Sequence, residues 1–511
     1  MIQPNVKKRT WMLAALASLP MLPAVTAQTP EAFAITSAAN ALGGVARVRA
    51  VRTLTMEGEG ANPNVGQNLT PDAPLTDWKV TEYKKSIDLA HWRLHFAQRR
   101  DAKFPFSMAN INRQNYILDG AVSFNLERDG KASRAPDAVL RDRRIEMLNN
   151  PVAIVRAALD GKVTASHLRK EGKQEGKVDA IDLKTPQGDE LTLTLDAATH
   201  LPASLRWISS SDNLADIHNE TFYSDYAPVH SDFAPLGGLQ LPRHYVNKID
   251  FRNYTTVDLR ISKNTVDGDV GNLEAPAAIK SASAPQPPPI TVDPVEAAPG
   301  VWWMKGSGNH SSTLYIFDDH KTLFEAPASA AQAAVVIAKA RTIVPEKPLT
   351  EMIISHHHFD HTGGLRTVVA EGLTIISHQG NEQYFRELAS RQATLHPDQL
   401  ALHPMPFKFR GVGEKTVLKD KALEVDLYQL QGNIHSSYNL VAWLPKYKIL
   451  SQSDLFDAGW YYFLWTDNYF ANLQRLGLRF DRDLPVHGRI LGHDDEMRIV
   501  EERKKSPHHE D

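Results

Sequence analysis

Apolar and polar residues alternate in several stretches of the first half of the chain. The clearest stretches are Val80–Lys84, Trp92–Phe96, Leu191–Leu195 and Thr255–Ile261. Alternation with a period of two is typical of strands that bury one face of a sheet. Between Arg144 and Leu159 the apolar residues instead recur every three to four positions, which predicts a helix. Residues 28–280 are therefore expected to form a mostly antiparallel sheet with a few helices.

The second half of the chain mixes buried strands with helices. Leu349–Ser355 is a largely apolar run that predicts a buried strand, and Gly363-Gly364 precedes apolar residues at helical spacing from Leu365 to Leu373. Between the halves, Ser281–Ile290 is rich in Pro, Ala and Ser and has no periodicity, which indicates a linker. The predicted organisation is an α+β chain with a β-rich domain at 28–280, a linker at 281–293 and a second domain at 294–511.

The N-terminus has the parts of a secretory signal peptide. Lys7–Arg9 is basic, Trp11–Leu22 is apolar, and Val25 and Ala27 are the small residues that precede a cleavage site. We predict that residues 1–27 are removed and that the mature protein is periplasmic or secreted. The apolar stretch is short for a bilayer and contains Pro20, so no integral membrane span is expected after cleavage.

Composition narrows the class of protein. The chain has 511 residues, which is too long for one ordinary domain, and its 57 basic and 60 acidic residues give a formal charge of −3. This balance, without a basic patch, argues against a nucleic-acid partner. The chain has no cysteine, so it has neither a disulfide framework nor a cysteine for lipid attachment at the cleavage site.

Four metal-binding side chains directly follow the predicted strand at Leu349–Ser355. They are His356, His358, Asp360 and His361. Imidazole and carboxylate ligands suit zinc, iron and related divalent ions. Side-chain alternation directs His356 and His358 toward one ion, and the turn into the next helix directs Asp360 and His361 toward a second. A tag or a solvated histidine loop is not preceded by a buried strand and followed by a helix start.

Three further ligands can be proposed from residues that end strand-like runs. His435 follows Leu423–Leu430, Asp454 ends the run that begins at Tyr447, and His487 precedes Gly488. A metal site needs such distal ligands, because one loop rarely completes a coordination shell. Each of these residues taken alone would be read as an ordinary buried side chain.

With these seven residues, the chain over about 294–511 resembles the metallo-β-lactamase superfamily. The resemblance implies an αββα sandwich and a two-metal centre. It implies that His356, His358 and His435 hold one metal, that Asp360, His361 and His487 hold the other, and that Asp454 bridges both. β-Lactamases of this superfamily usually carry cysteine, or no ligand, where Asp454 stands; a bridging aspartate instead resembles the thioesterases, lactonases and related esterases. Glu325 replaces an aspartate that many members carry after the second strand.

The first domain resembles, more distantly, the periplasmic lipoprotein-carrier fold. The resemblance rests on the pattern of Leu42–Gly58 and on late strands near Leu241–Val246 rather than on a chemical motif. It implies either a groove for a hydrophobic ligand or a domain that only positions its neighbour. No catalytic group of residues stands out in this region.

The function implied is an exported, dinuclear, metal-dependent hydrolase of a carbonyl ester, lactone or thioester. Two divalent ions, zinc first and iron or manganese otherwise, would share the hydroxide that attacks the carbonyl carbon, and Asp360 would act catalytically by orienting it. The alternatives are a β-lactamase, an iron-dependent redox member of the superfamily, and a lipid or lipoprotein carrier with a structural metal domain.

The expected partner is a small apolar or aromatic molecule. An aromatic run, Phe456–Phe470, follows Asp454, although its rings could equally pack the core. Tyr438, Trp460 and Tyr461 are the candidate contacts with substrate or oxyanion.

Overall fold

A computed structural model gives the fold. It describes Met1 and residues 28–102, 111–172, 177–229, 238–325, 327–459 and 463–505. Residues 2–27 of the predicted signal peptide lie outside this description, as do Trp460 and Tyr461. In the described part of the chain, no helix combines the length and the apolar character needed to cross a membrane.

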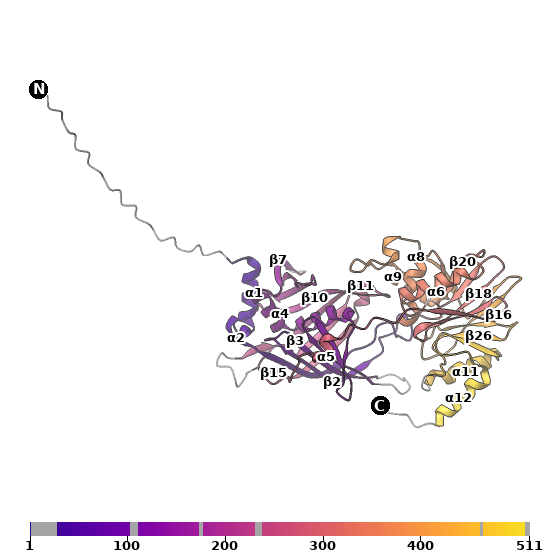
Figure 1. The fold of residues 1–511 in the computed structure, drawn as a ribbon, viewed down its shortest axis with the longest axis horizontal. Coiled ribbons are helices and arrows are strands. Elements are labelled where there is room, and N and C mark those ends of the chain that lie inside the picture. Colours follow the sequence, from indigo (N-terminus) through magenta and orange to yellow (C-terminus); the bar gives the residue numbers. More distant parts are fainter. Residues whose placement is uncertain are drawn as a thin grey trace.

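One antiparallel sheet of thirteen strands forms the framework of the first domain (Figure 1). In spatial order its strands are β6 (Ala132–Arg134), β5 (Val122–Leu126), β4 (Ile111–Asp119), β3 (Arg93–Ala102), β2 (Trp78–Asp88), β1 (Thr53–Ala61), β15 (Thr255–Val266), β14 (His244–Ile249), β11 (Ala215–Ser224), β10 (Pro202–Ser211), β9 (Glu190–Asp196), β8 (Val178–Lys184) and β7 (Thr164–Glu171). A separate pair, β12 (Ala227–Val229) and β13 (Leu239–Leu241), lies beside it. The four alternating stretches fall in β2, β3, β9 and β15, so the predicted sheet is confirmed.

Helices cover one face of this sheet. They are α1 (Pro30–Ala41), α2 (Val45–Ala50), α3 (Leu140–Leu148) and α4 (Pro151–Leu159), with a 3-10 turn at Asp137–Val139. Their apolar residues share one core with the inward side chains of the strands, and Val152 and Ile154 of α4 are fully buried there. This burial fixes which face of the sheet points away from solvent.

The prediction of one continuous helix from Arg144 to Leu159 is wrong. Asn150 is extended, and its side chain accepts hydrogen bonds from the backbone N–H groups of Val152 and Ala153. Pro151 occupies the first helical position. An N-cap followed by proline starts a new helix, so the segment divides into α3 and α4.

The second domain contains two sheets. The seven-stranded sheet is β16 (Val292–Ala298), β17 (Val301–Gly306), β18 (Ser312–Ile316), β19 (Lys321–Phe324), β20 (Leu349–Ile353), β21 (Thr374–His378) and β22 (Lys408–Val412). The five-stranded sheet is β23 (Lys415–Lys419), β24 (Glu424–Gln429), β25 (Leu440–Leu444), β26 (Ile449–Gln452) and β27 (Arg482–Pro485). β19 to β22 are parallel neighbours, as are β26 and β27.

Helices lie on the outer faces of both sheets. The helices are α6 (Ala330–Thr342), α7 (Phe359–Thr362), α8 (Leu365–Ala370), α9 (Glu382–Ser390), α10 (Gln399–Leu402), α11 (Leu464–Leu476) and α12 (His493–Lys505), with α5 (Ala277–Ser281) in the connection between domains. One apolar core joins α6, α8 and α9 to the first sheet, a second lies between the sheets, and a third joins the second sheet to α11 and α12. The predicted αββα sandwich after a β-rich domain is thus confirmed. The predicted domain boundaries stay a prediction.

The two domains share an apolar interface. Leu214, Ile249 and Phe251 of the first domain belong to the same core as α8 and α9, and the ring of Phe251 meets that of Tyr384 edge-on at 5.8 Å between centroids. Polar contacts surround this core, among them a 3.0 Å ion pair between Arg391 and Asp250. The first domain is therefore packed against the second rather than only linked to it.

Candidate metal centre

The strand-to-helix loop after β20 directs its side chains toward two points. Ser355 to His358 continue from the strand, and the carbonyl of His358 then accepts hydrogen bonds from the N–H groups of His361 and Thr362, both at 3.0 Å. These bonds start α7 at Phe359. Because the chain turns here, Asp360 and His361 lie on the opposite side of the loop from His358.

The distal residues arrive from the edge of the second sheet. His435 lies in the loop between β24 and β25, where the side chain of Asn433 accepts its backbone N–H at 2.9 Å. Asp454 follows β26 and His487 follows β27, and these two strands are parallel neighbours. Adjacent parallel strands end at the same sheet edge, so both residues reach the loop of His356 to His361.

The structure brings all seven predicted ligands together in two groups. His356, His358, His435 and Asp454 form one group, and Asp360, His361, His487 and Asp454 form the other; within each, the ligand atoms lie within 4.8 Å of one another.

Asp454 belongs to both groups. Its Oδ2 is 3.3 Å from His435 Nε2 and 3.1 Å from His361 Nε2, while its Oδ1 is 2.8 Å from His487 Nε2. This is the arrangement that a carboxylate shared by two cations requires. The role of these residues as ligands stays a prediction.

The histidine nitrogens that face away from the centre have hydrogen-bond partners. His356 Nδ1 is 2.8 Å from Ser355 Oγ, and His361 Nδ1 is 2.9 Å from Ser453 Oγ. His487 Nδ1 donates to the carbonyl of Asn309 at 2.7 Å. Such outer partners fix the tautomer and leave the other nitrogen's lone pair for a metal.

In His358 the nitrogen with the outer hydrogen-bond partner is Nε2 rather than Nδ1. Its Nε2 donates to the backbone carbonyl of Asn68 at 2.9 Å, so its Nδ1 faces the centre, 3.1 Å from His435 Nε2. His435 Nε2 is also 3.2 Å from His356 Nε2. Three imidazole nitrogens that converge at this spacing can share a proton as N–H···N hydrogen bonds or can bind one cation, which is the fit expected of a metal site.

Burial and nearby charges set the protonation states of His356, His358 and Asp454, and these states favour metal binding. Burial holds the pKa of His356 well below its usual value and lowers the pKa of His358 to about 3, so both rings are neutral donors at neutral pH. Burial disfavours the charged form of Asp454, but His361 and His487 outweigh it and hold the pKa of this carboxyl well below its usual range. Neutral imidazoles and ionised carboxylates are the forms that bind divalent ions.

His361 is the histidine with the most negative surroundings. Burial opposes its protonation, but the charges of Asp454, Asp360 and Glu325 raise its pKa well above the usual value. Glu325 is fully buried, accepts the N–H of Ser355 at 2.8 Å, and has its other oxygen 3.5 Å from His361 Nδ1. Without a metal a proton compensates this negative charge, and a bound cation would take its place.

A candidate ligand, Asp454, and a residue beside His361, Glu325, have left-handed backbone conformations. Asp454 has φ +59° and Glu325 has φ +71°. Such conformations cost a non-glycine residue roughly 1–3 kcal/mol and persist where the surrounding structure fixes them, which is common at functional sites.

Two aromatic residues, Tyr438 and Trp465, bear on the prediction that aromatic side chains lie near the centre. Tyr438 stacks on His378 with ring centroids 4.4 Å apart, and whether it contacts substrate stays a prediction. Trp465, at the start of α11, lies 4.6 Å from the ring of His435 and donates to the carbonyl of Asp454 at 2.6 Å. One ring of the predicted aromatic run therefore packs directly on the candidate ligands.

Sequence reasoning missed several residues around the centre. Gln67 donates to Asp360 Oδ1 at 3.2 Å, and Asn68 accepts from His358, although both belong to the first domain. Ser453 and Asn309 support His361 and His487. Ser453 could have been found by its position next to Asp454, whereas nothing in the local sequence of Gln67 marks it.

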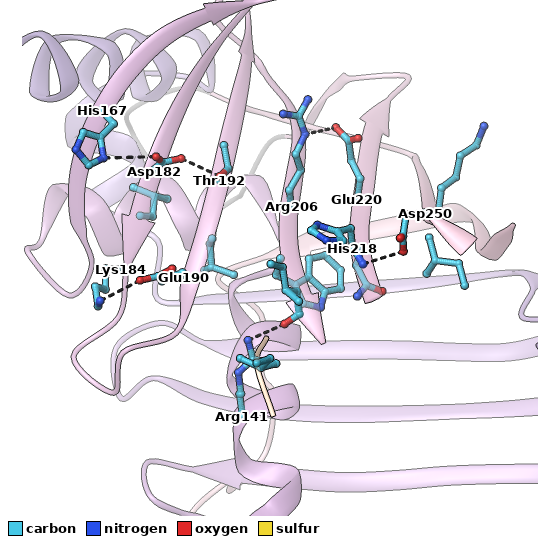
Figure 2. Close-up of a pocket in the computed structure, with 18 of the residues that line it drawn as sticks. Arg141, His167, Asp182, Lys184, Glu190, Thr192, Arg206, His218, Glu220 and Asp250 are labelled. Atoms are coloured by element: carbon cyan, nitrogen blue, oxygen red, sulfur yellow. Dashed lines mark hydrogen bonds and ion pairs between the residues drawn. The ribbon is translucent and has the colours of Figure 1, made fainter. Parts of the chain in front are cut away.

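A groove on the first domain provides a contrast to this centre. This sheet groove, of about 990 Å³, lies along β7 to β11 and β14 (Figure 2). Its charged side chains pair with one another: Lys184 with Glu190 at 3.0 Å and Arg206 with Glu220 at 2.8 Å. Among the described residues, groups with the convergence of a metal site occur at the candidate centre and not in the groove.

Comparison with known proteins gives one family. The model of the metallo-beta-lactamase superfamily matches residues 306–450, which contain the ligand loop and His435. No curated protein matches the chain.

Solved structures to which this chain is similar include the following three. A metallo-beta-lactamase from Pontibacter korlensis is 15% identical, with 42% of this chain and 100% of that chain covered and a TM-score of 0.34. The metallo-beta-lactamase FIM-1 from Pseudomonas aeruginosa, in its mono-zinc form, is 17% identical, with 43% and 97% covered and a TM-score of 0.34. The inverting sec-alkylsulfatase Pisa1 from Pseudomonas sp. is 15% identical, with 42% and 41% covered and a TM-score of 0.32. Residues 306–450, which lie within the second domain, thus match the metallo-beta-lactamase superfamily.

Proposed function

We propose that this protein is an exported dinuclear metal-dependent hydrolase that cleaves a carboxylic ester, lactone or thioester. Members of the superfamily are mostly metal-dependent hydrolases, and the observation that carries the proposal here is the position of Asp454. One carboxylate lies 2.8 Å from His487 and 3.1–3.3 Å from His361 and His435, so it belongs to both ligand groups. A site for two ions that share a ligand is suited to hydrolysis, because the ions act on one reacting centre.

The candidate ligands divide into one set for each ion. His356, His358 and His435 would hold one ion and Asp360, His361 and His487 the second. Two ions bound there would lower the pKa of a water molecule toward neutrality and polarise the carbonyl oxygen of a substrate. Zinc is the first candidate and iron or manganese the others, because all accept imidazole and carboxylate ligands.

Asp360 is the most exposed of the candidate ligands. Its side chain is 39% exposed, whereas those of His361, Asp454 and His487 are 0–6% exposed. Its Oδ2 lies 3.3 Å from His361 Nε2. From there it can orient an attacking water molecule.

An apolar or aromatic acyl group fits the surroundings of the centre. Ile434 and Leu464 are 46% and 47% exposed, and each is next to a segment that contributes to the centre. Asn433 and Asn468 join the two segments by a 3.1 Å hydrogen bond. Exposed apolar side chains beside polar ligands are typical of small-molecule sites.

The absence of cysteine favours ester-type substrates over β-lactams. A shared aspartate resembles the superfamily's esterases and lactonases, whereas its β-lactamases usually have cysteine or no ligand there. Export rests on the N-terminal sequence alone and would make cytosolic thioesters poor candidates.

The test is proton release by the zinc-loaded mature protein with lactones, aryl esters, thioesters, phosphodiesters and a cephalosporin. Asp360→Ala and the exposed surface variant His91→Ala are measured beside it. Turnover of an ester-type substrate that is lost in Asp360→Ala and kept in His91→Ala supports the proposal. Turnover of the cephalosporin alone would establish a β-lactamase instead. Silence throughout would contradict a hydrolase and favour the iron-redox or carrier functions.

A further inference from the structure

The loop between β1 and β2, residues 62–77, leaves the sheet of the first domain and reaches the metal centre. Arg100 holds its start by donating to Asn62 Oδ1 at 2.5 Å and Asn64 Oδ1 at 3.1 Å. Arg252 holds its later part by donating to the carbonyl of Pro71 at 2.6 Å. Arg252 also donates to Glu387 of α9 at 2.8 Å, so the loop is tied to both domains.

Four consecutive residues of this β1–β2 loop contact the segments that carry the candidate ligands. Gly66 O accepts from Phe359 N at 3.1 Å, Gln67 Nε2 donates to Asp360 Oδ1 at 3.2 Å, Asn68 O accepts from His358 Nε2 at 2.9 Å, and Leu69 O accepts from Ser437 N at 2.9 Å. Three of the four bonds use the loop's backbone carbonyls. The loop therefore lies along the ligand loop as an ordered neighbour and joins it to the loop of His435.

Asn68 decides which nitrogen of His358 faces the centre. Its backbone carbonyl accepts a hydrogen bond from Nε2–H, so the lone pair of His358 is on Nδ1, directed toward His435. For His356, Ser355 next to it in sequence performs this role, and for His361 it is Ser453 of the same domain. His358 is thus a candidate ligand whose outer partner comes from the first domain.

Gln67 acts on the most exposed candidate ligand. Asp360 is 39% exposed, and a carboxylate with that freedom can turn away from a metal. The amide of Gln67 binds Oδ1, while Oδ2 lies 3.3 Å from His361 Nε2. Together these two contacts fix the plane of the carboxylate, and Gln67 accomplishes this from a separate domain.

Gly66 allows the close approach that these contacts need. It has φ +75°, and a Cβ added there would lie 2.3 Å from ring atoms of Phe359. Real Cβ atoms do not come that close, so any other residue would push the β1–β2 loop away from the ligand loop.

We propose that the first domain completes the metal centre, with Gln67 and Asn68 acting as positioning residues for Asp360 and His358. The proposal rests on the metal site in the proposed function but not on the bond that is cleaved. It assigns the first domain a role in metal binding itself. Because each contact joins the two domains, metal binding and docking of the β1–β2 loop must favour one another equally.

Two substitutions with matched controls test this in the full mature chain. Gly66→Ala displaces the loop, and Gly161→Ala is its control, since Gly161 also has positive φ (+68°) but has open space around its Cβ position. Gln67→Met removes the amide at nearly constant size, and Gln114→Met does the same on an exposed part of β4. Each protein is titrated with Co²⁺ and Zn²⁺ against a competing chelator, and the visible spectrum of the Co²⁺ form is recorded. Thermal unfolding of the metal-free proteins reports stability separately.

The expected result is a loss of metal affinity of about 10–100-fold in Gly66→Ala and Gln67→Met, the range found for outer partners of ligands. The Co²⁺ spectrum should change in both and stay unchanged in both controls. A residue that only packs the interface would lower the melting temperature and leave the spectrum unchanged. If Gly66→Ala fails to fold, Gln67→Met carries the test.

Unchanged affinity and spectrum in Gln67→Met would overturn the inference, even in an active hydrolase. Conversely, an altered spectrum in a protein that hydrolyses none of the substrate classes would contradict the proposed function and leave the inference standing. The two proposals can therefore fail separately.

Discussion

The sheet groove and the metal centre both gather charged and imidazole side chains, but they arrange them differently. In the groove the charges pair with opposite charges, as in Lys184 with Glu190 and Arg206 with Glu220 (Figure 2). In the centre five histidines converge around Asp360 and Asp454, and most of their outward nitrogens have their own partners. The charges of the groove neutralise one another in pairs, whereas the convergent side chains of the centre can bind a cation.

This difference shows why the groove is the weaker functional candidate. A ligand in the groove would have to compete with ion pairs that are already formed and partly exposed to water, and such pairs exchange partners at little gain. A cation at the centre would relieve repulsion among buried donors. Convergence, burial and outer hydrogen bonds identify the site better than its volume does.

Removing the shared carboxylate should have the largest effect. Asp454→Ala leaves both ligand groups incomplete, so we expect the second metal to be lost and catalysis to fall by more than about 100-fold, beyond the cost of removing an outer partner. Elemental analysis and substrate turnover check this. Asp182→Ala removes a carboxylate of the groove as a control and should alter neither quantity. Equal effects of the two changes would erase the contrast between the regions.

Removing an outer partner should have a smaller effect. Ser453→Ala deprives His361 Nδ1 of its 2.9 Å contact, and we expect metal affinity to fall by about 10–100-fold. The control is Ser436→Ala, because Ser436 is buried beside His435 and its hydroxyl has no hydrogen-bond partner among the described residues. Chelator competition should separate the two variants; similar affinities would mean that the outer contact does not orient the ring.

A third kind of charged environment, the carboxyl pair Asp483 and Glu496, should produce a pH effect on stability. Burial raises the pKa of Asp483 to about 7, and burial together with the charge of Asp483 raises that of Glu496. Between about pH 4 and 7 this pair then binds more protons in the folded chain than in the unfolded chain. The pair's contribution to the free energy of unfolding should therefore fall as pH rises through this window, by up to about 1.4 kcal/mol per pH unit for one proton.

Asp483→Asn should reduce this slope. Denaturant unfolding of both metal-free proteins from pH 5 to 8 measures it, and the histidines of the centre cancel in the difference. Identical slopes would mean that Asp483 ionises normally in the folded protein.

Disrupting an ion pair of the groove should have the smallest effect. Arg206 is 35% exposed and binds Glu220 and Glu171. For pairs of this exposure, Arg206→Gln should change the free energy of unfolding by no more than about 1 kcal/mol and leave turnover unchanged. A large loss of activity would instead make the groove part of the functional site.

Sequence reasoning succeeded where the signal is local. His356, His358, Asp360 and His361 are close in sequence, and a strand before them and a helix after them set their directions. The break between α3 and α4 could also have been predicted, because Asn150-Pro151 is an N-cap followed by proline. The helical spacing of apolar residues continues across the break and favoured one helix instead. The outer contact from Ser453 is adjacent to Asp454 and could have been proposed.

Contacts between domains could not be predicted in this way. Gln67 is 293 residues from Asp360 in sequence, and Asn68 acts through its backbone carbonyl, which every residue possesses. Their positions follow from the packing of Leu214, Ile249 and Phe251 against α8 and α9, which depends on the whole fold. A single sequence contains no local pattern for such a contact.

Anomalous diffraction at the zinc edge, from crystals of the zinc-loaded protein, would show whether Asp454 is shared by two ions. We expect two zinc peaks roughly 3.5–4 Å apart, the spacing of two-metal hydrolytic sites. One should lie among His356, His358 and His435 and the other among Asp360, His361 and His487, with Asp454 between them. A single peak, or zinc bound away from Asp454, would contradict it.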